Sequence, residues 1–121
     1  MKTTREQMKS VSRLLRRADF LRVHKTGKKW AAAGVIMQAA MADSDKIRFG
    51  VTVSKKLDKT AVGRNRMRRR LKAAGYDILS VHARTGADYV LIGRHETPDR
   101  AYDALCEDIK TCLRKTGFMK E

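Results

Sequence analysis

The chain has 121 residues, which suits a single domain, and 42% of them are hydrophobic, enough for one modest core. Its 28 lysines and arginines outnumber 13 acidic residues and leave a formal net charge of +15, which makes a polyanion, most often nucleic acid, the expected class of partner. No apolar run approaches membrane-spanning length, and neither end carries an amphipathic helix with bulky apolar anchors for a membrane surface.

The N-terminal part predicts a tail and a first helix. Residues 1–12 are polar and basic and predict a flexible tail, so that a single α/β domain covers 13–121. A helix is predicted from about Val11 to Thr26, and Gly27 follows at the position of a C-terminal cap. One face of this helix carries apolar and aromatic residues at three- and four-residue spacing: Phe20, Val23 and His24.

Two strands are predicted next. Residues 30–41 are rich in alanine, which favours a helix, but Trp30, Val35 and Ile36 favour a strand. Residues 46–54 alternate apolar side chains with small or polar ones, as a strand with one buried face does. Because a short turn joins the two segments, we interpret 30–41 as a strand that pairs antiparallel with 46–54.

The remaining elements are two helices around a strand. Residues 61–82 predict a long helix whose core-facing stripe comprises Met67, Leu71, Ala74, Ile78 and Val81. Residues 87–94 are almost continuously apolar and predict a strand covered on both faces. The last helix is predicted to begin with Thr97 as N-cap and Pro98 at its first position, and to end at Gly117. Its apolar stripe comprises Tyr102, Leu105, Ile109 and Cys112.

Together these elements predict a small two-layer α/β sandwich in the order helix, strand, strand, helix, strand, helix. Cys106 and Cys112 lie six residues apart on one predicted helix, without partners at metal-ligand spacing. They are expected to be reduced thiols in a cytoplasmic protein. No arrangement of histidines and acids has the spacing of a catalytic or metal site.

The segment "GRNRMRRRLKAAG", residues 63–75, holds five arginines and one lysine. On a helix these cations occupy nearly every position outside the core stripe, and the segment contains no acid three or four residues away. They also lie near the helix N-terminus, where the dipole disfavours positive charge. A solvated face usually mixes signs, so we interpret this face as a phosphate-binding surface with strongly salt-dependent affinity. Arginine's planar fork suits structured nucleic acid.

Asn65, between the first two arginines, could hydrogen-bond a base edge or a ribose hydroxyl, or it could cap the helix start; the sequence favours neither. Asp58 is the only acid between positions 46 and 72, so this region lacks the carboxylates with which a protein-only nuclease holds metal ions. Three lysines extend the basic patch upstream: Lys55, Lys56 and Lys59.

Two linked motifs resemble the signature of the bacterial ribonuclease P protein subunit. They are "FGVTVSKK" (49–56) and, seven residues later, "RNRMRRRL" (64–71). The segment "LLRRADFLRVHKTGKKW" (14–30) is similar to the opening segment of that family, with its Asp-Phe pair and the glycine after the helix. The likeness covers most of residues 14–116.

The resemblance implies that a partner RNA is the catalyst, cleaving precursor tRNA endonucleolytically to release the 5′ leader and form the mature 5′ end. The protein would be inactive alone and contribute no catalytic residue. It would bind ribonuclease P RNA and precursor tRNA and support hydrolysis with Mg²⁺ in the holoenzyme, without binding metal alone. No membrane and no obligate protein partner are implied. The implied fold has a left-handed βαβ crossover and a short extra strand between the two early strands and the main helix.

By position, the resemblance implies a surface for the catalytic RNA that comprises Arg64, Asn65, Arg66, Arg68, Arg69, Lys72, Lys55 and Lys56. The implied leader cleft, between the first helix and the sheet, comprises Phe20, His24, Gln38, Arg48 and Thr52. His24 stands where the family often has a second aromatic residue, and Gln38 lies near a common tyrosine position. Imidazole stacks on bases less strongly than larger rings, and an amide cannot stack. Arg70 replaces a common apolar residue.

Two other classes of function compete with this one. A ribosomal or nucleoid protein without an enzymatic role would share the basic charge but not the linked motifs. A self-sufficient nuclease is disfavoured because the basic region lacks paired carboxylates.

Overall fold

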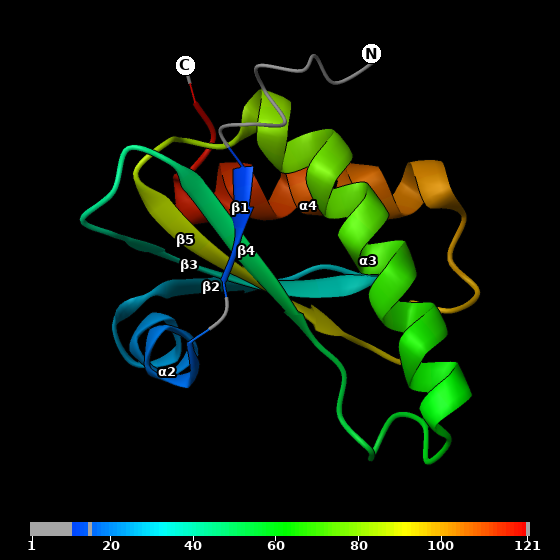
Figure 1. Cartoon of the computed structure of the whole chain (residues 1–121). Helices are drawn as coiled ribbons and strands as arrows, with labels where there is room; N and C mark the ends of the chain where they lie inside the picture. The colour runs from blue at the N-terminus through cyan, green and yellow to red at the C-terminus, as the bar shows by residue number, and fades with distance from the viewer. Residues whose placement is uncertain (1–10, 15, 121) are drawn as a thin grey trace.

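The structure is a computed structural model that describes residues 11–14 and 16–120 (Figure 1). Within these residues three helices flank one five-stranded sheet with the strand order β1-β4-β5-β3-β2. In chain order the elements are β1 (Val11–Arg13), α2 (Arg17–Thr26), β2 (Lys28–Ala31), β3 (Val35–Met41), β4 (Ile47–Thr52), α3 (Ala61–His82), β5 (Ala87–Gly93) and α4 (Tyr102–Thr116). The predicted α/β fold is confirmed, with the difference that helices cover both faces of the sheet.

Strand β5 lies at the centre of the sheet, as its apolar sequence on both faces requires. It pairs in parallel with β4, from Ile47 opposite Ala87 onward, and antiparallel with β3, from Met41 opposite Ala87 onward. Helix α3 connects β4 to β5 and so forms a parallel crossover. That this crossover is left-handed stays a prediction.

The two faces of the sheet are covered unequally. Helices α3 and α4 pack against one face and against each other, and they form the main core. Helix α2 lies on the opposite face, around a smaller apolar cluster that includes Val23 and Val90 (Figure 1). Because α2 has only ten residues, it leaves part of that face open. The fully buried side chains of the main core include Met37, Leu71, Leu79, Tyr89, Leu105, Ile109 and Leu113.

The predicted pairing of the two early strands is wrong. Residues 30–41 form two strands, β2 and β3, and β5 separates β3 from β4. A strand that is apolar on both faces gains most from a central position, and this outweighs the proximity of β3 and β4 along the chain. No strand lies at 53–60, between β4 and α3; the additional strands are instead β1 and β2 at the two edges.

The first and last helices begin later than predicted. Val11–Arg13 form β1, which pairs in parallel with β4, and Val11 is buried in the main core, so the helix starts only at Arg17. Residues 1–10 of the expected tail lie outside the described residues. Helix α4 starts at Tyr102, because Thr97 does not cap it: its buried hydroxyl accepts from Arg94 N at 2.8 Å and donates to Gly34 O at 2.7 Å.

The predicted stripes of the two long helices are largely confirmed. Met67, Leu71, Ala74 and Ile78 are buried on α3, although Val81 is only half-buried and Leu79 was missed. On α4, Tyr102 is 38% exposed and does not belong to the core, whereas the rest of the stripe does. Gly117 ends α4 with φ of 81°, a left-handed conformation that favours glycine.

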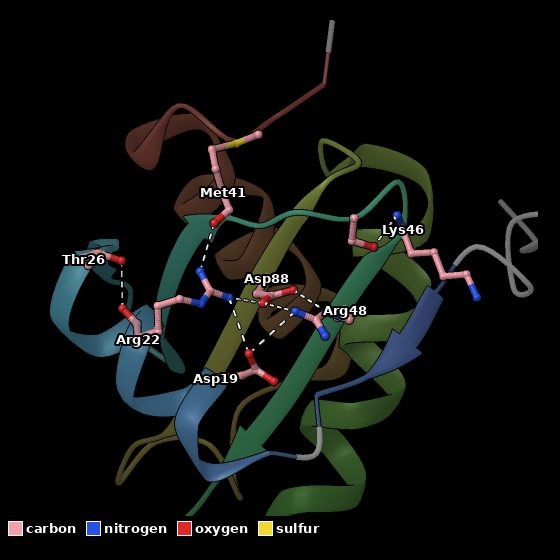
Figure 2. Close-up of polar contacts among 8 residues, drawn as sticks. Asp19, Arg22, Thr26, Met41, Lys46, Arg48 and Asp88 are labelled. Carbon is pink, nitrogen blue, oxygen red and sulfur yellow. Dashed lines mark hydrogen bonds and ion pairs between the residues drawn. The ribbon is translucent and has the colours of Figure 1, made fainter.

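A buried carboxylate fastens α2 to the sheet (Figure 2). Asp88 of β5 is fully buried and accepts two hydrogen bonds from Arg48 of β4, at 2.8 and 2.7 Å. Arg22 of α2 donates to the same carboxylate and, at 2.9 Å, to Met41 O. Asp19, in the first turn of α2, lies 3.8 Å from the Arg48 guanidinium. Two acids and two arginines thus form a closed, electrically neutral cluster.

We expect Asp88→Ala to lower the free energy of unfolding by about 2–3 kcal/mol, because it leaves two guanidinium groups without their shared partner. Both arginine side chains keep about a third of their surface in water, which limits the loss. Urea unfolding followed by circular dichroism measures the change. Asp43→Ala, at an exposed turn residue, is the control, and an equal effect of both variants would contradict the role of Asp88.

Candidate nucleic-acid interface

Helix α3 begins with a side-chain cap that does not involve Asn65. The Thr60 hydroxyl accepts from Gly63 N at 3.0 Å, and Asp58 in turn accepts from the Thr60 amide and hydroxyl at 2.8 and 2.7 Å. These hydrogen bonds from Thr60 lower the pKa of Asp58 below its ordinary value. The negative charge before the first turn offsets part of the cost of placing cations there. Asn65 is therefore free of the capping role that the sequence left open.

Beyond the cap, α3 presents an outward cationic face. Arg68 donates to the Asn65 side chain at 2.7 Å, and both side chains lie beside a shallow hollow of about 420 Å³. Val62, 79% exposed at the start of the helix, lies at the same hollow and was missed by the sequence analysis. The hollow is lined by Val62, Asn65, Arg68, Arg69 and Lys72. Lys55 and Lys56 are exposed in the turn before α3.

Two arginines of α3 are engaged by the protein itself. Arg70 donates to the carbonyl oxygens of Thr97 at 3.1 Å, Pro98 at 2.6 Å and Arg100, and so holds the loop before α4. Arg64 donates to Asp58 O at 2.9 Å and is half-buried. The arginine that departs from the family pattern is thus a structural residue, whereas Arg66 and Arg69 are exposed.

A pocket of about 350 Å³ joins this face to helix α2. It lies at the edge of β4 beyond the end of β1, where no strand among the described residues pairs with Gly50 or Val51 on that side. Arg68 and Lys72 line both this pocket and the hollow on α3, so the two depressions adjoin each other at these two side chains. The pocket is lined by Arg13, Leu14, Phe20, Phe49, Gly50, Val51, Arg68, Lys72 and Tyr76.

Strand register shows which part of the sheet α2 leaves open. One cross-strand row runs Gly50, Val90, Gln38 and Lys29. The Phe20 ring lies so close over this row that a β-carbon on Gly50 would meet it at 2.3 Å, so any larger residue there would displace the ring. The next row, Thr52, Ile92, Ile36 and Ala31, is exposed or half-buried. We name this second row the open row; together with the adjacent face of α2 it forms the region of the cleft expected from the sequence.

The rim of this cleft comes from one face of α2. Phe20 and His24 lie one turn apart on it, and Gln38 contacts His24 through a hydrogen bond of 3.0 Å between the amide nitrogen and Nδ1. The structure thus brings together three predicted cleft residues and places Thr52 on the open row. Arg17 and Leu21, both exposed, fall on the same side of the helix, Arg17 three residues before Phe20 and Leu21 three residues before His24. This spacing was the signal that sequence reasoning missed.

Arg48, also predicted for the cleft, lies in the neighbouring row and is occupied by Asp88 and Asp19. Its hydrogen bond to Asp88 raises the pKa of the guanidinium, so it stays charged while holding α2 in place. About a third of its side chain is exposed. Its contact with a leader stays a prediction.

Other kinds of site find little support in the described part of the chain. No three His, Cys, Asp or Glu side chains gather there in a group that could hold a metal ion. Both cysteines are free. Burial raises the pKa of the Cys106 thiol above its ordinary value and raises the pKa of the Cys112 thiol to about 11, which makes both thiols poor nucleophiles. Among residues 11–14 and 16–120, no helix has the length and apolar character needed to cross a membrane.

Comparison with known proteins shows the family of this chain. The family model described as Ribonuclease P matches residues 8–117. The chain belongs to the family of ribonuclease P protein components. It is 46% identical over 116 residues to the "Ribonuclease P protein component" of Paramagnetospirillum magneticum, with 92% of this chain and 86% of the relative covered. A second relative, from Gluconacetobacter diazotrophicus, is 44% identical over 106 residues, with 87% and 90% covered.

Solved ribonuclease P proteins have the same fold. The Staphylococcus aureus protein superposes with a TM-score of 0.73 at 25% identity, covering 89% of this chain and 97% of the other. The Thermotoga maritima protein gives 0.72 at 25% identity, covering 85% and 96%. The resemblance inferred from the linked motifs is confirmed.

We expect Arg70→Met to lower the free energy of unfolding by about 1–3 kcal/mol, because it removes the donors for three backbone carbonyls of the loop before α4. Arg66→Met, the matched control on an exposed position of the same helix, should change it by less than about 0.5 kcal/mol. Chemical denaturation measures both. Equal stability of the two variants would show that the loop contacts of Arg70 contribute nothing.

Proposed function

We propose that this chain is the protein subunit of a ribonuclease P holoenzyme, which removes the 5′ leader of precursor tRNA by hydrolysis and leaves the mature 5′ end. The cationic face of α3 binds the catalytic RNA, and the cleft beside α2 binds the single-stranded leader. The observation that carries the proposal is the continuity of these two surfaces through the pocket that Arg68 and Lys72 share. One RNA assembly can therefore contact both.

The charge of α3 supports the first part of the proposal. Its exposed cations have no acidic neighbour within the segment, so a bound phosphate backbone would relieve their mutual repulsion and release counterions. The cleft supports the second part. It offers an aromatic ring at Phe20 and an apolar floor at Ile36 and Ile92, which suit unstacked bases better than a duplex.

In this proposal the partner RNA performs the cleavage and the protein alone is inactive. Mg²⁺ is expected to act in the holoenzyme, but the described residues offer no ligand set for it, so no step is assigned to a protein-bound ion. The protein's own residues bind and orient RNA. The free cysteines are consistent with action in the cytoplasm.

Reconstitution tests the function directly. At low Mg²⁺ concentration, adding the protein to ribonuclease P RNA and a precursor tRNA should accelerate cleavage at the 5′ end of the mature tRNA. The protein without RNA should not cleave. An unchanged rate would refute the proposal and favour a basic binding protein without enzymatic role, and cleavage by the protein alone would favour a nuclease.

The contribution of α3 can be measured through salt dependence. Arg68→Ala should weaken binding to the catalytic RNA and reduce the slope of log affinity against log salt by about 1, because one phosphate contact is lost. Arg114→Ala removes the same charge from an exposed position of α4 and is the control. If both variants change the slope equally, the RNA surface does not lie on α3.

A further inference from the structure

The two polar residues at the cleft are bonded to each other. His24 is exposed on α2, whereas Gln38 of β3 is only 6% exposed, and its amide nitrogen lies 3.0 Å from His24 Nδ1. They come from different elements, 14 residues apart. Each residue stands at a separate position where an aromatic side chain is common in the family, so the sequence alone does not reveal that they are in contact.

The chemistry of this contact determines what His24 presents to solvent. With the amide nitrogen of Gln38 facing the ring, the amide donates and Nδ1 accepts, and in this tautomer the ring hydrogen lies on Nε2. Because Gln38 holds Nδ1, the Nε2–H group lies on the opposite, outward side of the ring. The pair therefore fixes one ring orientation and offers one directed hydrogen-bond donor at the rim of the cleft.

The surroundings favour an RNA strand as the partner of this donor. Lys29 lies directly opposite Gln38 in the register and is exposed, as is Lys25, the neighbour of His24 on α2. Phe20 lies one turn earlier on the same helix face, near enough for a base stacked on it to leave the next nucleotide close to His24. Such a strand carries acceptors on its phosphates and on its base edges.

We propose that His24 donates a hydrogen bond through Nε2–H to an acceptor atom of one leader nucleotide, and that Gln38 is a positioning residue that sets the tautomer and orientation of His24. This inference rests on the proposed function of the cleft. In this proposal His24 binds the leader by a directional hydrogen bond instead of by stacking. The strength of this contact depends on the acceptor atom that a nucleotide offers and not on the face of its base. The alternative is that His24 merely satisfies the buried amide of Gln38.

A double-mutant cycle separates these possibilities. In the holoenzyme, His24→Ala and Gln38→Leu should each weaken binding of precursor tRNA about fivefold, the effect of losing one hydrogen bond. The double variant should lose no more than His24→Ala alone, because Gln38 acts through His24. None of the three should change binding of a tRNA without leader. Independent, multiplicative losses, or no loss in the His24→Ala variant, would overturn the proposal.

Modified leaders identify the acceptor. Single methylphosphonate linkages remove the charge of one phosphate, and base analogues remove one acceptor from a base edge. At one leader position a modification should weaken binding to the wild-type holoenzyme about fivefold and have no effect with His24→Ala. If the methylphosphonate linkage has this effect, the acceptor is a phosphate oxygen. If a base analogue has it, the acceptor is an atom of the base edge. If no single modification loses its effect in the variant, His24 makes no such contact.

Phe20→Ala distinguishes failure of this inference from failure of the proposed function. If Phe20→Ala weakens leader-dependent binding while His24→Ala does not, the cleft binds the leader and only the role of His24 is refuted. If neither variant changes leader-dependent binding, the leader does not lie in this cleft. Urea unfolding of each variant confirms that the folded protein is being compared.

Discussion

The arrangement of the molecule depends on the buried carboxylate of Asp88. It lies on the central strand and binds Arg48 from the neighbouring strand and Arg22 from α2, so it sets where a short helix lies on a broad sheet. A carboxylate without water would be costly, and the two guanidinium groups make the burial tolerable. Because the cluster lies on one side of α2, the helix covers two cross-strand rows and leaves the open row beside Phe20 and His24.

The same segment of α3 combines anchors to the rest of the protein with an outward cationic face. Its core stripe and Arg70 attach the helix to the sheet and to the loop before α4, and the cap at Thr60 with Asp58 stabilises its first turn. The cations between these anchors are thereby held in fixed positions, although they repel one another in the free protein. A cationic face of this kind without acidic partners is well suited to a polyanion, since bound phosphates decrease its repulsion.

Periodicity predicted the elements that have a strong pattern of their own. The bounds of α3 and the buried character of β5 were predicted from sequence because local spacing determines both. The starts of α2 and α4 were not. Val11 and Thr97 look like a helix residue and an N-cap, but a parallel partner strand and the distant carbonyl of Gly34 decide their conformations.

For the site, the sequence by itself determined the class of partner and the family. Charge and the linked motifs depend only on residue identity and spacing, so the details of side-chain packing do not change them. Only the tertiary structure decided which residues act together. In the folded protein, Arg48 and Arg70 donate hydrogen bonds to other groups of the protein. Arg68 lines the same pocket as Phe20, and His24 is hydrogen-bonded to Gln38. Such contacts join segments far apart in the chain, and side-chain packing, which no local pattern encodes, determines them.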